Sequence, residues 1–131
     1  IVSHGALPTV DATWTATAVG DYNGDGKSDV FWRRQDGINY VWHIDGAVIT
    51  GGVLSVVSHG LLPRVDSGWA VAGHGDYNGD GRADVFWRHT ASGTNYLWFV
   101  DGSTISGGVL AIVGNGLLPG LDSSWSAPNP K

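Results

Sequence analysis

The sequence predicts an all-β protein made of repeated four-stranded units, and three observations lead to this class. First, the 131 residues include 21 Gly and 7 Trp but no Cys or Met, so that residues typical of strands and turns outnumber strong helix formers. Second, long segments recur at a nearly constant spacing, which indicates a repeat architecture. Third, each unit contains four short runs with strand character, separated by turns that carry Gly.

The repeat is nearly perfect over long stretches. The segment at 20–26 recurs unchanged at 75–81, and the segment at 29–33 recurs at 84–88. A third motif, which reads Gly-x-Leu-Pro-x-x-Asp ahead of a Trp, begins at Gly5, Gly60 and Gly116. We therefore divide this single repeat domain into a partial repeat at 1–13, a first blade-like unit at 14–68, a second at 69–124 and a tail at 125–131.

Four strands are expected in order along the first unit. The first alternates Thr with Ala, the second is β-branched and aromatic, the third alternates large rings with smaller residues, and the fourth is apolar. These strands span 14–19, 29–33, 39–44 and 53–57, with turns at 24–26, 36–37, 45–46 and 51–52. Four short strands per repeat of this length are typical of a β-propeller blade. A β-sandwich is the alternative, but its strands would not repeat so faithfully.

Two blades and part of a third do not close a propeller ring, which takes about four to eight blades. An open pair would leave an apolar blade face bare at each end, which lowers solubility. We therefore expect the ring to be completed by a homo-oligomer, either a trimer or a tetramer, or by the remainder of a longer parent chain.

The segment between the first two expected strands has the donors of a calcium site. Oxygen-bearing side chains stand at positions 1, 3, 5 and 9 of the loop, and the carbonyl at position 7 can add a further ligand. The Gly residues between them permit the sharp turn. The candidate ligands are Asp21, Asn23, Asp25, Lys27 and Asp29 in the first copy, and Asp76, Asn78, Asp80, Arg82 and Asp84 in the second.

Other interpretations of this loop are weaker. An EF-hand would need a bidentate Glu at position 12, where this chain has Trp32 and Trp87. Zinc is disfavoured because there is no Cys and no His lies in the cluster. The remaining alternative is an Asx-rich turn whose side chains only cap backbone N–H groups. Three carboxylates about 4 Å apart repel strongly without a cation, which favours two Ca²⁺ per chain.

The segments GDYNGDGKSDVFWR and GDYNGDGRADVFWR resemble FG-GAP/VCBS repeats, the calcium-binding blades of integrin-type β-propellers, of many secreted bacterial proteins and of some lectins. The resemblance covers nearly the whole chain. It implies a calcium loop between the first two strands of each blade, ligated by the Asp and Asn residues named above. It also implies a secreted or extracellular setting. The chain departs from the family in carrying two blades, where family members usually carry a whole ring.

Composition and motifs speak against several functions. The net charge is −5, with only 7 Lys and Arg, which disfavours nucleic acid as a partner. There is no apolar run of 18 residues that would span a membrane. The His residues are not kept between the units, since Phe99 replaces His43 and Asn115 replaces His59, and most Asp outside the loops stand in turns. No catalytic residue is expected, and the sequence gives no support for an enzyme.

The aromatic residues favour a lectin-like recognition module that binds carbohydrate. Trp and Tyr rings stack on sugar rings, and nearby Arg, His or Asn side chains bond the hydroxyl groups. Repetition would supply several weak sites and hence avidity. The alternatives are that the repeated Trp residues form only an inter-blade core, or that the chain is a structural or protein-interaction propeller module of a larger secreted protein. The candidate ligand-binding residues are Arg33, Tyr40, Trp42, His43, Arg88, Tyr96 and Trp98.

Overall fold

The computed structural model describes residues 5–121 and contains eight β-strands. The strands are β1 (Trp14–Gly20), β2 (Asp29–Arg34), β3 (Asn39–Thr50), β4 (Val53–Leu62), β5 (Trp69–Gly75), β6 (Asp84–His89), β7 (Asn95–Ser106) and β8 (Val109–Leu118). The expected tail at 125–131 lies outside the described residues, as do His4 and the third-copy Asp122 and Trp125.

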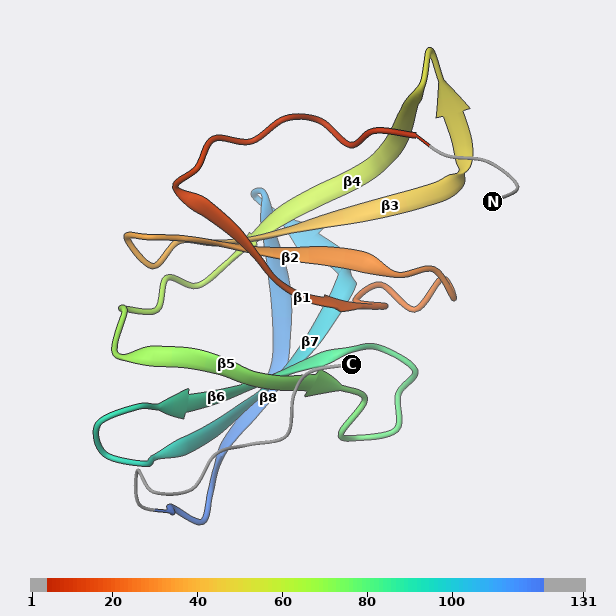
Figure 1. Ribbon diagram of the computed structural model, residues 1–131. Helices are drawn as coiled ribbons and strands as arrows, with labels where there is room; N and C mark the ends of the chain where they lie inside the picture. The colour runs from red at the N-terminus through yellow and green to blue at the C-terminus, as the bar shows by residue number, and fades with distance from the viewer. Residues whose placement is uncertain (1–4, 122–131) are drawn as a thin grey trace.

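The strands form two antiparallel four-stranded blades. The first blade comprises β1 to β4 and the second comprises β5 to β8, and each strand pairs with the next along the chain. The two blades join where Leu61 of β4 pairs in parallel with Val109 of β8 (Figure 1). The prediction of an all-β fold built from propeller-like blades is therefore confirmed. None of the described residues belongs to a helix long and apolar enough to cross a membrane.

One predicted turn is wrong. Asp45 and Gly46 were expected to end a strand, but both lie inside β3, which continues to Thr50. The Asp45 carboxylate accepts a hydrogen bond from the Ala47 N–H at 3.0 Å, and the register with β4 shifts between Asp45 and Ile49. The Asp-Gly pair therefore forms an irregularity within a long hairpin. The hairpin turns at Gly51 and Gly52, whose φ values of 60° and 80° suit a tight two-residue turn.

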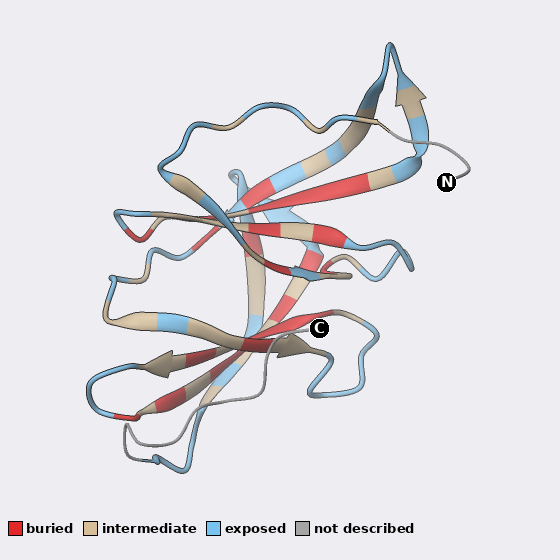
Figure 2. Cartoon of the chain, in the orientation of Figure 1, coloured by how far each residue is buried: buried red, intermediate tan, exposed pale blue. Residues whose placement is uncertain are grey.

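The core lies between the blades. Phe31 of the first blade meets Trp87 of the second edge to face, with ring centroids 6.2 Å apart. Tyr22 and Phe31 are fully buried on one side of this junction, and Val85 and Trp87 are buried on the other (Figure 2). We call the side of a blade that carries Tyr22 and Phe31 its front face, and the side that carries Trp87 its back face. The front face of the first blade thus packs on the back face of the second.

Backbone contacts fix the distance between the blades. The Gly102 N–H donates a 2.8 Å hydrogen bond to the Tyr22 carbonyl, and a Cβ at Gly102 would lie 2.4 Å from that oxygen. The Ala83 N–H bonds the Asp21 carbonyl at 2.6 Å. Only Gly permits the first of these approaches, so the sequence at 102 is set by the neighbouring blade.

Candidate functional site

The two candidate metal loops occupy equivalent places in the blades. Residues 21–28 connect β1 to β2, and residues 76–83 connect β5 to β6, as the repeat predicted. Gly24 and Gly26 have φ values of 78° and 82°, and Gly79 and Gly81 have 79° and 81°. These left-handed conformations turn the chain twice within a few residues, which directs the alternating side chains toward the inside of the loop.

The first Asp of each loop organises the turn. Asp76 Oδ1 accepts hydrogen bonds from the Gly79 and Asp80 N–H groups at 2.7 and 3.0 Å, and its Oδ2 accepts from the Gly81 N–H at 2.7 Å. Asp21 makes the same set of bonds in the first loop. These donors lower the pKa of Asp76, because they favour the ionised carboxylate. The loop therefore presents a charged carboxylate.

The last Asp of each loop is buried where the loop enters the second strand of its blade. Asp84 accepts hydrogen bonds from the Tyr77 N–H at 3.0 Å and the Val100 N–H at 2.9 Å, which tie the loop to β7. Asp29 is bonded likewise to the N–H groups of Tyr22 and Ile44. Burial raises the pKa of Asp29 to about 6, although these two hydrogen bonds oppose the rise. A cation beside such a carboxylate would offset its desolvation.

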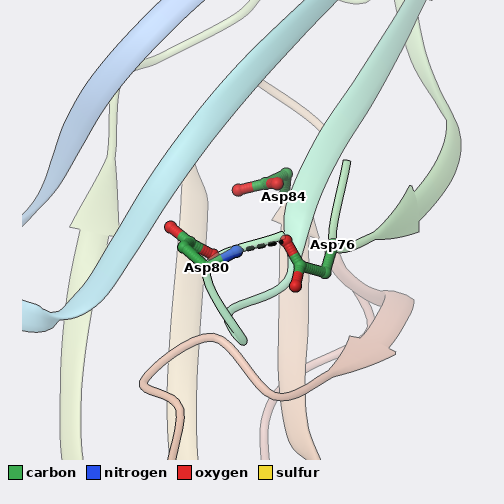
Figure 3. Close-up of side chains that lie close together, drawn as sticks. All are labelled: Asp76, Asp80 and Asp84. Atoms are coloured by element: carbon green, nitrogen blue, oxygen red, sulfur yellow. Dashed lines mark hydrogen bonds between the residues drawn. The ribbon is translucent and has the colours of Figure 1, made fainter. Parts of the chain in front are cut away.

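In the second loop the three carboxylates converge. Asp76, Asp80 and Asp84 each direct one carboxylate oxygen so that these atoms lie within 4.8 Å of one another (Figure 3). Among residues 5–121, no other group of three or more His, Cys, Asp or Glu side chains brings its ligand atoms this close together. In the first loop, Asp25 Oδ2 is instead 3.5 Å from the side-chain amide of Asn23.

The donor set fits calcium. All side-chain candidates are hard oxygen donors, which Ca²⁺ prefers, and six to eight of them are needed at about 2.3–2.6 Å. The Arg82 guanidinium pairs with two carboxylates, with Nε 3.2 Å from Asp101 Oδ1 and Nη1 3.7 Å from Asp80 Oδ2, and the Lys27 ammonium lies 3.7 Å from Asp45. Neither cationic group can bind a metal ion. These two residues therefore remain candidates through their carbonyl oxygens alone. The same Asp side chains cap backbone N–H groups, so the Asx-turn arrangement coexists with this donor set.

A second candidate site is an aromatic pocket between the blades. It has a volume of about 290 Å³ and lies between the back face of the second blade and the segment that leaves the first. Its wall includes Trp87 and Trp98, whose rings meet nearly perpendicularly with centroids 5.1 Å apart. The lining residues are Arg64, Val65, Asp66, Trp69, Trp87, Tyr96 and Trp98.

The structure divides the predicted ligand-binding residues into separate groups. Tyr96 and Trp98 line the pocket together. Their counterparts Tyr40 and Trp42 lie on the back face of the first blade, where Tyr40 contacts Trp14 and Trp42 contacts Trp32. His43 is the neighbour of Trp42 on β3 and points to the opposite face, where its Nδ1 lies in hydrogen-bonding contact with Ser58 Oγ.

The two predicted Arg residues hold the chain together. Arg33 donates hydrogen bonds to Asn39 Oδ1 at 2.9 Å and to the carbonyl of Asp66 at 2.6 Å, and its guanidinium lies 5.0 Å from the Trp87 ring centroid. Arg88 bonds Asn95 Oδ1 at 2.9 Å and the Leu121 carbonyl at 3.1 Å. Both therefore anchor the segment that leaves their own blade.

Five of the seven pocket residues were not in the predicted ligand-binding set: Arg64, Val65, Asp66, Trp69 and Trp87. Trp69 and Trp87 had been assigned with the other repeated Trp residues to the core, and Arg64 had no assignment. The sequence carries one signal for Arg64, because it replaces Thr9 and Gly120 at the same position of the repeated motif. Because Arg64 interrupts an otherwise regular repeat, it should be tested for a role in binding.

The comparison with protein families now identifies the class. Residues 21–87 match the FG-GAP-like repeat, and this match spans about half of the chain. The chain therefore belongs to the FG-GAP-like repeat family. No curated protein and no solved structure matches the chain.

Proposed function

We propose that the chain is a non-catalytic recognition module, stabilised by calcium, that binds carbohydrate in the aromatic pocket between its blades. The observation that carries this proposal is the pocket itself, in which four aromatic side chains stand beside a cation and a carboxylate. Small-ligand sites combine an apolar wall with a few polar groups that fix orientation. A sugar ring offers the matching surface, with C–H groups on its face and hydroxyl groups at its edge.

The polar groups stand at the rim of the pocket. Arg64 is exposed, and the exposed Asp66 is held in place because its Oδ1 accepts a 2.9 Å hydrogen bond from the Gly68 N–H. Trp69 packs against His89 with ring centroids 5.0 Å apart, which limits its movement. The pocket thus places Trp69, whose position is fixed by packing, beside the positively charged Arg64 and the negatively charged Asp66, which can both form hydrogen bonds.

Calcium has a structural role in this proposal. The second loop connects β5 to β6, and its last ligand candidate, Asp84, is bonded to the backbone of β7. An ion held by Asp76, Asp80 and Asp84 would therefore tie three strands of the blade, and its binding free energy would add to folding. One ion in each loop would give two per chain. Such loops suit an extracellular setting, where calcium reaches millimolar concentrations and weak sites are filled.

Titration with a panel of free monosaccharides tests the carbohydrate site, with tryptophan fluorescence and saturation-transfer NMR as readouts. We expect a saturable response from the protein, and a loss of at least tenfold in affinity for Trp69→Ala. The matched control is Trp14→Ala, which changes the equivalent residue of the first blade outside the pocket. Equal losses in both variants, or no response to any sugar, would contradict the proposal.

A protein-binding module is the second candidate. It is favoured by the exposed apolar residues at the end of the second blade, which include Val113, Leu117 and Leu121. Members of this repeat family are typically non-enzymatic, and we infer the same for this chain. This second candidate would be favoured if the protein captured a protein partner and if the pocket variant Trp69→Ala bound that partner as well as the original does.

A further inference from the structure

The junction between the two blades shows which contacts one blade makes with the next. The end of β4 bonds the second blade at the β7–β8 turn, where the Leu61 N–H donates to the Gly108 carbonyl at 2.8 Å. The Gly102 N–H bonds the Tyr22 carbonyl at 2.8 Å. A Cβ at Gly60 would lie 2.1 Å from Leu110 Cδ1, so this approach is also close.

The first blade presents the same surface on its own back face, and this surface is open. Gly46 is the counterpart of Gly102, yet a Cβ placed there would meet no atom within 4 Å. Gly46 is exposed and Gly102 is buried. The difference arises because Gly102 faces Tyr22 of the preceding blade, whereas no described residue stands in that position beside Gly46.

The second blade presents the matching front face. Tyr77 is 47% exposed although its counterpart Tyr22 is 0% exposed, and Leu118 is 38% exposed although its counterpart Leu62 is 3% exposed. Leu117, which corresponds to the bridging residue Leu61, is 70% exposed. The chain therefore carries both halves of its internal blade junction a second time, one half on each blade.

We propose that these two surfaces bind each other between molecules, so that the second blade of one copy docks head to tail on the first blade of another. By equivalence with the internal junction, the Gly46 N–H would bond the Tyr77 carbonyl of the other copy, and Leu117 would pair with Val53. The internal junction is the template for this interface. The inference is independent of the proposed carbohydrate site.

The N-terminal segment competes for part of this surface. Ala6 bridges Val53 in parallel, and its N–H donates to the Gly52 carbonyl at 2.8 Å, just as Leu61 does at Gly108. Gly5 and Ala6 begin the same repeated motif as Gly116 and Leu117. Residues 5–8 therefore act as an internal strap on the place that Leu117 of another copy would take, and docking requires the strap to leave.

Two variants test docking in opposite directions, with oligomeric state measured by analytical ultracentrifugation over a range of protein concentrations. Ala6→Pro removes the N–H that holds the strap and leaves both docking surfaces unchanged, so we expect at least a tenfold lower dissociation constant for self-association. Gly46→Ala adds a methyl group in open space within one molecule, where φ is unstrained. It should leave monomer melting unchanged and abolish association, because the Cβ would collide with the Tyr77 carbonyl of the docked copy.

Cross-linking tests the register, since the chain has no Cys of its own. A mixture of Val53→Cys and Leu117→Cys chains should form mixed disulfide dimers on oxidation, and more of them when Ala6→Pro is added to the first chain. The mismatched control is Val57→Cys, which is also exposed on β4 and lies away from the expected pairing. The proposal is overturned if Ala6→Pro remains monomeric at every concentration, if Gly46→Ala associates as well as the original, or if the two cysteine pairs react equally.

Discussion

The two blades have nearly the same sequence, but their front faces differ in burial. Tyr22 and Phe31 are fully buried, whereas Tyr77 is exposed and Phe86 is half-buried. The local residues are nearly identical from the loop through the second strand, and the three differences (Lys27/Arg82, Ser28/Ala83 and Arg34/His89) do not include the Tyr or the Phe, so local preference does not explain the difference. The cause is the neighbour, because the first blade packs on the second and the front face of the second packs on no described residue. In a repeat protein, the burial of such a residue is therefore determined by the contact between neighbouring units.

Where the two blades differ in sequence, the changes compensate within each blade. His43 contacts Ser58 in the first blade, and the equivalent pair in the second is Phe99 and Gly114. A Cβ at Gly114 would lie 3.0 Å from Phe99 Cδ2, so the larger ring requires the smaller neighbour. Similarly, the Tyr96 hydroxyl bonds Asn115 where Tyr40 bonds His59. The repeat therefore conserves the filled volume and the hydrogen bond, even where it changes the residue.

The largest expected effect tests whether the junction sets stability. Phe31→Ala removes a fully buried ring from between the blades and should lower the free energy of unfolding by about 3–5 kcal/mol. Phe86→Ala, the identical change in the second blade, should cost about 1–2 kcal/mol, because its ring is half-buried. Urea unfolding of both variants at low protein concentration measures the difference. Equal losses would show that burial at the junction does not distinguish the two positions.

Calcium should stabilise the folded chain by about 3 kcal/mol for each loop that it fills, when its free concentration is a hundredfold above the dissociation constant of that loop. Melting with calcium and with EDTA measures this gain. Asp80→Ala and Asp25→Ala should each lower stability and remove the share of the calcium response that belongs to their loop. We expect the larger share for Asp80, because its loop already gathers three carboxylates.

The control for the calcium prediction is Asp36→Ala. This exposed carboxylate pairs with Arg34 outside both loops, so its loss should leave the calcium response unchanged. A melting temperature that does not change on addition of EDTA would contradict the calcium assignment in both blades.

The sequence was informative where structure depends on local residues and on repetition. It predicted the four strands of each blade, the position of the Asp-rich loops and the hairpin turn at 51–52. It misplaced a turn at Asp45, because an Asp-Gly pair is compatible with both a turn and an irregular strand. It could not separate Tyr22 from Tyr77, since identical residues differ only through the blade beside them. The pocket around Trp69 was missed for the same reason, because its wall comes from two units.

A smaller effect is expected from one hydroxyl group in the junction. The Tyr22 hydroxyl is buried and has no hydrogen-bond partner among residues 5–121. Burial raises its pKa strongly, as expected for a phenol held away from water. Tyr22→Phe should therefore raise the free energy of unfolding by about 1 kcal/mol, because it removes an unsatisfied polar atom. Tyr77→Phe should be neutral in the same urea measurement, and a loss of stability in Tyr22→Phe would indicate that the hydroxyl is bonded.

The smallest expected effect is a pH dependence of the free energy of unfolding that arises from His43 in the first blade and has no counterpart at Phe99 in the second. Burial lowers the pKa of His43 below its usual value of about 6.5, and its Nε2 has no partner among the described residues. The unfolded chain therefore binds a proton here more readily than the folded chain. His43 costs nothing above pH 7, and its cost in stability grows as the pH falls below about 6.5.

Exchanging the residues of the second blade into the first isolates this cost. His43→Phe combined with Ser58→Gly reproduces the pair Phe99 and Gly114, so the cavity and the packing partner change together. The combined variant should match the original protein at pH 7.5 and exceed it at pH 5 by up to about 1 kcal/mol, within the limit of 1.4 kcal/mol per pH unit for one proton. Urea unfolding at the two pH values measures it. Parallel pH profiles for the two proteins would mean that His43 accepts its proton equally well when folded, and that the difference between the blades at this position is one of shape alone.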